Sequence, residues 1–370
     1  MAETRLGIIG LGGFGLFCLD KCRLIPGVRI SAIADINAAA LDMLGSEYHI
    51  PLVTKDWREL IASPDVDVVH IITPPSEHAP MALAAIAAGK HVFVEKPLAI
   101  TIEDADAILA AAERQGVRVG IDFVMRYNPL YDLVRTITEE GLLGRMQWFL
   151  FQNEARDLPA THWFWDPRLS GGIPVEHGVH FFDIFTSLLG PGSIRWAERS
   201  CRASGVEDKW MMMLAYNKQV FGTFYHAFDK PEMIEQTRAE LEFAHGRITL
   251  EGWIPDRLSL EAVGDTATVQ RLAELLPAAE ITSLGDGPVA ILAEGEASTA
   301  SQRISAIVSA GEKQELYGRA VRNAMADFIA WTHDPTHRPL VTGEDGRHAL
   351  QTALDVTRLA RDTSGPCGAG

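Results

Sequence analysis

The sequence has few cysteines, an excess of acidic over basic residues, and no long apolar run. Its four cysteines, Cys18, Cys22, Cys201 and Cys367, form no C-x-x-C pair. Asp and Glu outnumber Lys and Arg by 49 to 33, which gives a formal net charge of −16. A surface of that sign repels nucleic acid and anionic membranes. No apolar stretch reaches the roughly 18 residues of a membrane-spanning helix.

What the chain does contain is typical of a globular enzyme. Apolar residues make up 47% of its 370 residues, and this length predicts about two domains. The first five residues lead directly into an apolar segment, so we expect no signal peptide. We therefore expect a cytoplasmic protein with reduced thiols that binds neither nucleic acid nor membrane.

A glycine-rich turn near the start of the chain predicts a dinucleotide site. Residues 5–9 form a short apolar run, and residues 10–15 then fit the pattern G-x-G-x-x-G before a helix-like stretch. Gly10 permits a tight turn, Gly12 lets a pyrophosphate approach the backbone, and Gly15 lets the helix pack against the sheet. The helix N-terminus then offers free N–H groups to the phosphates.

The acid that ends the next apolar run bears on the choice of cofactor. Asp35 follows residues 28–34 and lies 20 residues after Gly15 (35 − 15), where a carboxylate can accept hydrogen bonds from ribose hydroxyls. It would repel a 2′-phosphate, and Ile36, Asn37 and Ala38 supply no positive charge. The sequence therefore favours NAD over NADP.

The first third of the chain alternates strand and helix signals. Such an alternation predicts crossover helices between parallel strands, and hence a doubly wound Rossmann sheet. The apolar runs expected to form its strands are residues 5–9, 28–34, 65–72, 91–94 and 117–123.

The pattern changes after Asn128-Pro129. Strand-like segments then follow one another across short turns, which indicates a large, mainly antiparallel sheet. We expect a Rossmann domain over residues 1–125 and an α+β domain over residues 126–370, with C-terminal helices that pack back on the body. The segment 264–312 has weak signals and is not assigned.

Several motifs follow one another along the chain. Besides the glycine-rich turn, it has E-K-P at residues 95–97, R-Y-N-P at 126–129 and G-G-I-P-V-E-H-G-V-H-F-F-D at 171–183. Taken in this order, the motifs resemble those of the Gfo/Idh/MocA oxidoreductase family. In an open α/β sheet the site lies beyond the carboxyl ends of the strands, where residues 73–75 and 95–97 stand. Two positions depart from the family: Glu176 stands where Asp is usual, and Pro75 where Asn is frequent.

The resemblance implies an NAD-dependent dehydrogenase with Lys96, His180 and Glu176 as its catalytic residues. His180 suits the base that takes a hydroxyl proton while hydride leaves carbon, because imidazole titrates near neutrality. Glu176, four residues earlier, is expected on the same helix face, where it would orient the imidazole. Lys96 can stabilise a developing alkoxide. The resemblance also implies a cis bond between Lys96 and Pro97.

The remaining site residues divide between cofactor and substrate. The cofactor is expected to contact Gly10, Gly12, Gly13, Phe14, Gly15, Asp35, Thr73, Pro74, Pro75, His78, Glu95, Lys96 and Arg126. The substrate, a sugar, sugar acid or cyclitol oxidised at a secondary alcohol, is expected to contact Lys96, Arg126, Asn128, Trp163, Trp165, His177 and His180. Trp163 and Trp165 suit the C–H faces of a sugar, although a packing cluster explains them equally well.

Other interpretations stay open. A glycosidase or lyase of the same fold can use NAD without net redox change, ketone or imine reduction is possible, and an NAD-binding regulator would need no catalysis. His177, His180 and Asp183 resemble part of a zinc site, but no further ligands complete it, so no metal is expected.

The second sheet also suggests assembly. Alternation along each strand groups the apolar residues at 210, 212 and 214 with the run at 221, 223, 225 and 227, and further apolar residues stand on the opposite face. Apolar faces of this size are unlikely to stay in water. The sequence therefore predicts a homodimer or homotetramer built sheet to sheet.

Overall fold

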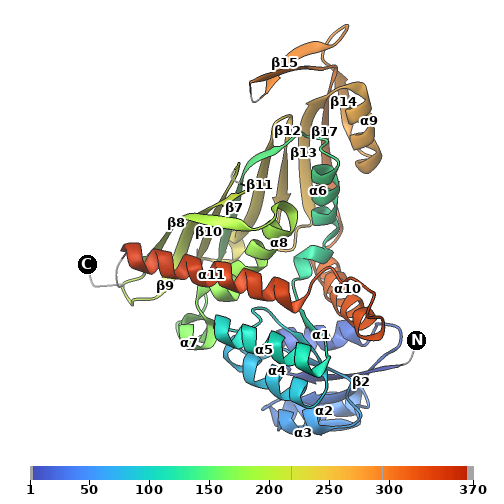
Figure 1. Ribbon diagram of the computed structural model, residues 1–370, viewed down its shortest axis with the longest axis vertical. Coiled ribbons are helices and arrows are strands. Elements are labelled where there is room, and N and C mark those ends of the chain that lie inside the picture. Colours follow the sequence, from blue (N-terminus) through green and yellow to red (C-terminus); the bar gives the residue numbers. More distant parts are fainter. Residues whose placement is uncertain (1–2, 218, 294, 365–370) are drawn as a thin grey trace. The chain divides into compact units, whose positions relative to one another are not determined.

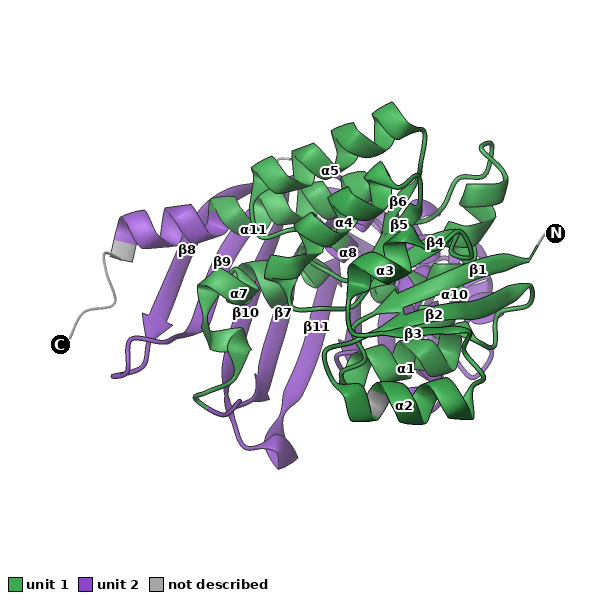
Figure 2. Ribbon diagram, turned by 90° about the horizontal axis from the view of Figure 1, so that it is seen from below, with its two compact units in different colours: residues 1–127, 160–183, 317–355 green, residues 128–159, 184–316, 356–370 purple. Residues whose placement is uncertain are grey.

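The computed structural model describes residues 3–217, 219–293 and 295–364, which form two compact units (Figures 1 and 2). Each unit is assembled from separate stretches of the chain. Unit 1 comprises residues 1–127, 160–183 and 317–355, and unit 2 comprises residues 128–159, 184–316 and 356–370. The division into functional domains at residue 126 stays a prediction.

Unit 1 is built on a six-stranded parallel sheet with the strand order 3-2-1-4-5-6. This is the order of a doubly wound dinucleotide-binding sheet, in which the order reverses between β1 and β4. Its strands, from one edge to the other, are β3 (Leu52–Thr54), β2 (Val28–Ala34), β1 (Thr4–Ile9), β4 (Val68–Ile71), β5 (His91–Val94) and β6 (Val119–Ile121).

Helices cover both faces of this sheet. Figure 2 shows α1 (Gly13–Cys22) and α2 (Ala38–Glu47) on one face, and α3 (Trp57–Ala62), α4 (His78–Ala87) and α5 (Ile102–Gln115) on the other. Thr101 caps α5 by accepting from the N–H of Asp104. Apolar residues of α1, α2 and α10 (Lys313–His333) share one core with the strands, including Leu19, Leu41, Leu44, Met325 and Phe328.

Unit 2 contains a nine-stranded sheet that is antiparallel except where β7 and β10 run parallel. Its order is β14 (Glu280–Ser283), β17 (Gln302–Ser309), β13 (Arg257–Gly264), β12 (Gly246–Glu251), β11 (Gln236–Phe243), β7 (Met146–Arg156), β10 (Val220–Lys230), β9 (Glu207–Tyr216) and β8 (Gly192–Cys201). A separate hairpin pairs β15 (Val289–Ala293) with β16 (Glu296–Ala300). Unit 2 also contains α6 (Pro129–Glu139) and α9 (Thr266–Leu275). Helix α7 (Pro167–Ser170) belongs to unit 1, and α8 (Val179–Leu189) and α11 (Gly343–Ser364) each include residues assigned to both units.

The predicted fold class, a Rossmann sheet followed by a large and mainly antiparallel sheet, is confirmed. The segment 264–312, which has weak sequence signals, contains α9 and the strands β14 to β17. Its strands are short and several lack the alternation of apolar residues, so the pattern that identifies strands is absent there.

The two faces of the unit 2 sheet differ from the grouping predicted by alternation. The strand register pairs Met212 with Phe224 and Met211 with Tyr225, so residues 210, 212 and 214 do not share a face with residues 221, 223 and 225. Met212 and Phe224 are buried, whereas Phe221 and Met211 belong to the opposite, exposed face. The grouping is wrong because alternation within one strand does not reveal its register with the next.

The cysteines also differ in part from expectation. Cys18 and Cys22 are free, as expected of reduced thiols, and they are fully buried in α1. Cys201 is disulfide-bonded, so the expectation of reduced thiols throughout is wrong for this residue. Cys367 lies outside the described residues.

Candidate functional site

The glycine-rich turn joins β1 to α1 and has the open backbone that the sequence predicts. Gly10 has a φ of +96°, and a Cβ there would lie 2.2 Å from the carbonyl oxygen of Ile72. A Cβ on Gly15 would lie 2.1 Å from the carbonyl oxygen of Gly10. Gly12 and Gly13 instead face open space, where a Cβ would have no described atom within 4 Å. At Gly10 and Gly15 the backbone packs too closely for any side chain. At Gly12 and Gly13 the N-terminus of α1 is open and fits a pyrophosphate.

Asp35 lies at the end of β2 and holds this turn. Its Oδ2 accepts from the N–H of Leu11 at 2.6 Å, and its Oδ1 accepts from the N–H of Asn37 at 2.7 Å. The side chain is half-buried, whereas that of Ile36 is 92% exposed. A carboxylate fixed beside the glycine-rich turn suits a ribose diol and opposes a 2′-phosphate.

Residues 73–75 follow β4 and residues 95–97 follow β5, and both segments were predicted to contact the cofactor. His78 links the two segments. Its Nδ1 lies 2.7 Å from the carbonyl oxygen of Pro97, and its Nε2 lies 2.8 Å from that of Thr73. The ring is fully buried, so its contacts are with the two loops themselves. This geometry favours a role for His78 in positioning the loops, while Thr73, Pro74 and Pro75 remain the part of that segment available to a cofactor.

Lys96 follows β5 and is joined to Pro97 by a cis bond, as the resemblance implied. Its Nζ donates to Oε1 of Glu176 at 2.6 Å and to the main-chain oxygen of the same residue at 2.8 Å. Both side chains are largely buried, with 15% and 13% of their surfaces exposed. A strong ion pair thus connects the end of β5 to the segment that precedes α8.

The segment that carries Glu176 is a π-helical turn, Pro174–Gly178, before α8. Gly171 and Gly172 precede it with φ values of +82° and +88°, which favour glycine. Such π-turns are rare and occur frequently at functional sites. The expectation that Glu176 and His180 share a helix face assumed the spacing of a regular α-helix. That spacing does not apply in the π-helical turn, so it does not support the expectation. The Glu176 carboxylate accepts instead from the ammonium of Lys96.

His180 lies in the first turn of α8 and is 3% exposed. Its ring packs near Phe123, Phe181 and His177, with ring centroids separated by 6.2, 6.1 and 6.3 Å. Burial, and then the positive charge of Lys96, lower the pKa of His180 well below its ordinary value. The ring is therefore unprotonated at physiological pH and can accept a proton, but it is a weaker base than the near-neutral imidazole expected from the sequence.

Arg126 is engaged in a cluster of its own. Its guanidinium donates to Asp183 at 2.8 Å, to Asp345 at 2.9 Å and to the carbonyl oxygen of Leu340 at 2.8 Å. These bonds tie the segment after β6 to α8 and to the start of α11 within unit 1. The arrangement favours a structural role for Arg126, and it also occupies Asp183, one of the three residues that resemble zinc ligands.

Asn128 has a local role in unit 2. Its Oδ1 caps α6 by accepting from the N–H of Leu130 at 2.9 Å, and its Nδ2 donates to the carbonyl oxygen of Pro255 at 2.9 Å. With 1% of its surface exposed, the side chain is used by the fold. Asn followed by Pro is a common helix start, so the cap was readable from the sequence.

The aromatic segment before α7 is a short 3₁₀ turn, Trp163–Trp165. Phe164 is buried and packs edge to face on Trp165 at 5.0 Å, while Trp163 and Trp165 are half-buried. His162 accepts from the N–H of Phe164 and packs near Trp163. The two tryptophans are therefore partly accessible, and both the packing and the sugar-binding interpretations stay predictions.

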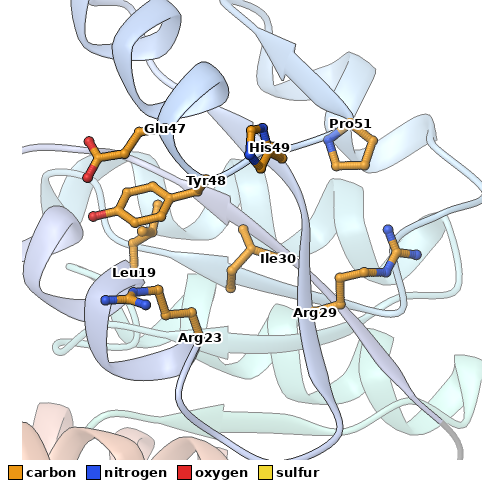
Figure 3. A pocket seen from close by; sticks show the side chains of 8 residues that line it. All are labelled: Leu19, Arg23, Arg29, Ile30, Glu47, Tyr48, His49 and Pro51. Carbon is orange, nitrogen blue, oxygen red and sulfur yellow. The ribbon is translucent and has the colours of Figure 1, made fainter.

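A hollow of about 410 Å³ lies elsewhere in unit 1, and Figure 3 shows its lining side chains. It is formed at the amino end of β2 by Arg29 and Ile30, and beside α1 and α2 by Leu19, Arg23, Glu47, Tyr48, His49 and Pro51. Arg23 is paired with Asp20 and Arg29 with Glu3. Ligands of open α/β sheets bind at the carboxyl ends of strands, so this hollow is not the expected cofactor site.

The described residues also bear on metals and membranes. Among them, one group of three side chains, Cys18, His70 and Glu95, brings possible metal-ligand atoms within 4.8 Å of one another. Within the same part of the chain, no helix combines the length and apolar character needed to cross a membrane.

Comparisons with known proteins agree with the motifs. Residues 4–123 match the Gfo/Idh/MocA oxidoreductase family with its NAD-binding Rossmann fold, and residues 131–249 match the Gfo/Idh/MocA C-terminal domain. A 1,5-anhydro-D-fructose reductase from Ensifer adhaerens is 34% identical over 233 residues, which cover 61% of this chain and 69% of that protein.

A relative of lower sequence identity and a solved structure are also similar to this chain. A scyllo-inositol 2-dehydrogenase (NAD(+)) from Bacillus subtilis is 27% identical over 189 residues, or 51% of this chain and 54% of that protein. The chain thus spans about half the length of several curated relatives that it matches. An NAD-binding oxidoreductase from Klebsiella pneumoniae has the same fold, with a TM-score of 0.77, 20% identity and 98% of each chain covered.

The matched residues, the strand order and the ordered motifs at residues 10–15, 95–97 and 171–183 agree with one another, and the chain belongs to the Gfo/Idh/MocA family of oxidoreductases.

Proposed function

We propose that the protein is an NAD-dependent dehydrogenase that oxidises a secondary alcohol of a sugar, sugar acid or cyclitol. The observation that carries the proposal is the Lys96–Glu176 ion pair in the same unit as the buried His180 and the glycine-rich turn. The names of two relatives, a 1,5-anhydro-D-fructose reductase and a scyllo-inositol 2-dehydrogenase, support a polyol-like substrate.

In this proposal, His180 takes the hydroxyl proton. Its lowered pKa keeps the imidazole unprotonated at physiological pH, so its nitrogen can accept the proton, although burial makes it a weaker base than an exposed imidazole. Lys96 donates a hydrogen bond to the substrate oxygen and stabilises the negative charge that develops as the proton leaves. Glu176 orients the Lys96 ammonium and partly balances its charge. The nicotinamide supplies the hydride acceptor when it is bound.

The finer choice of NAD over NADP rests on Asp35. Its carboxylate is fixed by the N–H groups of Leu11 and Asn37, and no cation stands at the next position, where Ile36 is exposed. A 2′-phosphate would therefore meet a negative charge without a compensating partner. NAD has a 2′-hydroxyl in place of that phosphate and meets no such repulsion.

We also propose a homodimer or homotetramer built through the exposed face of the unit 2 sheet. Trp148 of β7 and Phe221 of β10 pair directly in the register and are 41% and 49% exposed. Trp196 and Met211 lie on neighbouring strands and are 41% and 42% exposed. Contiguous large apolar side chains on a sheet face commonly mark an interface.

The test of the catalytic proposal is a panel of polyols, sugars and sugar acids, each assayed with NAD and with NADP by nicotinamide absorbance. A substrate-dependent rise in NADH that is abolished in His180→Ala supports dehydrogenase activity. Hydrolysis of a glycoside at constant NADH would instead favour the glycosidase alternative. Absence of both activities, together with tight NAD binding, would favour a regulator.

A further inference from the structure

Three side chains of the kinds that bind transition metals meet inside unit 1 and have no role in the proposed reaction. Cys18 lies on α1, His70 on β4 and Glu95 just after β5, and they are 0%, 0% and 7% exposed. One sulfur, one ring nitrogen and one carboxyl oxygen from these residues all lie within 4.8 Å of one another. Imidazole and carboxylate groups are seldom buried in a core without a partner. The group therefore needs an explanation.

The strand register explains why the three side chains meet. His70 pairs with Phe93 across β4 and β5, and side chains two residues apart on a strand point to the same face. The N–H of Glu95 still bonds to β4, so Glu95 follows Phe93 on the face that carries His70. Phe93 shares a buried core with Cys22 of α1, which covers this face (Figure 2). Cys18 stands one helical turn before Cys22.

Hydrogen bonds do not account for these polar atoms. Among the described residues, neither ring nitrogen of His70 nor Oε1 of Glu95 has a hydrogen-bond partner. Nε2 of His70 lies 3.7 Å from Oε1 of Glu95, which is too long for a hydrogen bond. Buried polar atoms are almost always paired, because an unpaired one loses its hydration without compensation. A single partner between the two atoms would satisfy both.

The separations fit ligands of one tetrahedral metal ion. Zinc binds imidazole nitrogen and carboxylate oxygen at about 2.0–2.2 Å, and two such ligands stand roughly 3.4 Å apart in a tetrahedron. This separation is close to the 3.7 Å between Nε2 of His70 and Oε1 of Glu95. Because the sulfur of Cys18 lies within 4.8 Å of both ligand atoms, a small movement of its side chain would bring it into the same ion's coordination.

We propose that Cys18, His70 and Glu95 bind a zinc ion in the core of unit 1. A thiolate, an imidazole and a carboxylate together suit zinc, whereas magnesium and calcium take oxygen ligands. The thiol of Cys18 releases its proton to solvent when it binds the ion. The thiolate and the Glu95 carboxylate then offset the two positive charges of zinc. This proposal goes beyond the proposed dehydrogenase activity and does not depend on it.

Asp122 has a second place at the same site. It follows β6 as Glu95 follows β5, and the register pairs the residues that precede them. Asp122 is 1% exposed, and neither of its carboxyl oxygens has a hydrogen-bond partner of ordinary geometry among the described residues. The group within 4.8 Å does not include it. We therefore assign it to accept from a water at the fourth position of the ion, as partners of metal-bound groups commonly do.

The position of the site suggests what the ion does for the protein. Helix α1 follows the glycine-rich turn, and Lys96 directly follows Glu95. One ion bound to Cys18, His70 and Glu95 would fix α1 to the ends of two neighbouring strands. We expect it to stabilise unit 1, since a ligand that binds the folded state alone raises stability. Glu95, which the sequence predicted to contact the cofactor, would then be used inside the core.

Metal content distinguishes Cys18 from its neighbour on the same helix. The wild type, produced without a metal-binding tag in zinc-supplemented medium and then desalted, should contain about one zinc per chain by elemental analysis. Cys18→Ser removes the thiolate with little change of volume. Cys22→Ser is the matched control, because Cys22 is also free and fully buried on α1 but lies outside the group. We expect Cys18→Ser to weaken zinc binding by about a hundredfold or more, and Cys22→Ser to retain zinc.

Two further measurements need no quantitation of zinc and no turnover. A chelator should lower the Tm of wild type and of Cys22→Ser, and should leave the Tm of Cys18→Ser unchanged because that variant has already lost the ion. Protein produced with cobalt in place of zinc should show a thiolate-to-cobalt absorption band that Cys18→Ser lacks and Cys22→Ser keeps. His70→Ala should lose the metal as well, and where that variant does not fold the two cysteine variants decide.

Three results would overturn the proposal. The first is a wild type that contains no zinc after growth in zinc-supplemented medium. The second is zinc that persists in both Cys18→Ser and His70→Ala, because the ion would then lie elsewhere in the protein. The third is equal loss of zinc from Cys18→Ser and Cys22→Ser, because the packing of α1, and not a bond to sulfur, would then control binding. All three are independent of the substrate panel, so failure of the dehydrogenase proposal would leave the zinc site standing.

Discussion

Nζ of Lys96 lies 2.6 Å from Oε1 of Glu176 and 2.8 Å from the main-chain oxygen of that residue. Two bonds from one ammonium to one residue fix its position more tightly than a single bond would. The third donor of the ammonium is left for another acceptor, and in the proposed reaction this is the substrate oxygen.

Loss of the Lys96 ammonium should remove stabilisation of the developing alkoxide. We expect Lys96→Ala to lower kcat by about 10²–10³-fold, as removal of a positioned donor does elsewhere. Lys96→Arg keeps the charge but changes the geometry and should recover little of the loss. Steady-state kinetics with the substrate found in the panel measure both. A Lys96→Ala enzyme with near wild-type turnover would contradict the proposed role.

Glu176 can be tested by changing its charge and its length separately. Glu176→Gln keeps the shape but weakens the bond to Lys96, and Glu176→Asp keeps the charge but shortens the reach. We expect about a tenfold loss of kcat in Glu176→Gln, the equivalent of roughly 1.4 kcal/mol, and a smaller loss in Glu176→Asp. Equal effects of the two variants would mean that packing, and not charge, matters at this position.

The same substitution should shift the pH profile in a defined direction. Glu176 offsets the positive charge of Lys96, which together with burial lowers the pKa of His180. Removing the carboxylate leaves that charge less balanced, so the pKa of His180 should fall further. Oxidation requires the neutral imidazole, and the acid limb of kcat/KM should therefore move to lower pH in Glu176→Gln. A shift to higher pH would argue against His180 as the base.

The choice of cofactor can be tested at Asp35 despite its second role in the turn. Asp35→Ala should weaken NAD binding by about ten- to hundredfold, because charge-assisted hydrogen bonds are lost. The ratio of NAD to NADP affinity separates the two roles: loosening of the turn should lower both affinities equally, whereas loss of charge repulsion should favour NADP. Asp35→Ser with Ile36→Arg should narrow or reverse the preference. Tighter binding of NADP than NAD by wild type would contradict the argument from the carboxylate.

The sequence allowed much of unit 1 to be predicted, because its signals are local. The glycines at 10 and 15 and the acid at 35 each act through nearby backbone, and the structure has the glycines in the turn after β1 and the acid at the end of β2, as predicted. The alternation of strands and helices predicted that the strands of this sheet run parallel.

What could not be predicted depends on contacts between distant segments. His78 bonds Pro97 and Thr73, and no pattern in the sequence indicates that its ring is used between two loops. The Glu176 side chain is directed to Lys96 by a π-helical turn, which the regular spacing of a helix does not predict. Glu95 and Asp122 follow the paired strands β5 and β6, and no local pattern in the sequence indicates that both acids are buried.

The last prediction concerns assembly through the exposed face of the unit 2 sheet. Phe221→Glu and Trp148→Glu each place a charge among large apolar side chains, and we expect either to weaken association by about a hundredfold, the effect of losing one central interface residue. Met233→Glu is the matched control, because Met233 is 86% exposed and lies in a 3₁₀ turn (Glu232–Ile234) outside the sheet. Light scattering across a dilution series should show an oligomer for wild type and for the control, and smaller species for the two sheet variants. A wild-type monomer at micromolar concentration, or equal dissociation of all three variants, would mean that this face has another function.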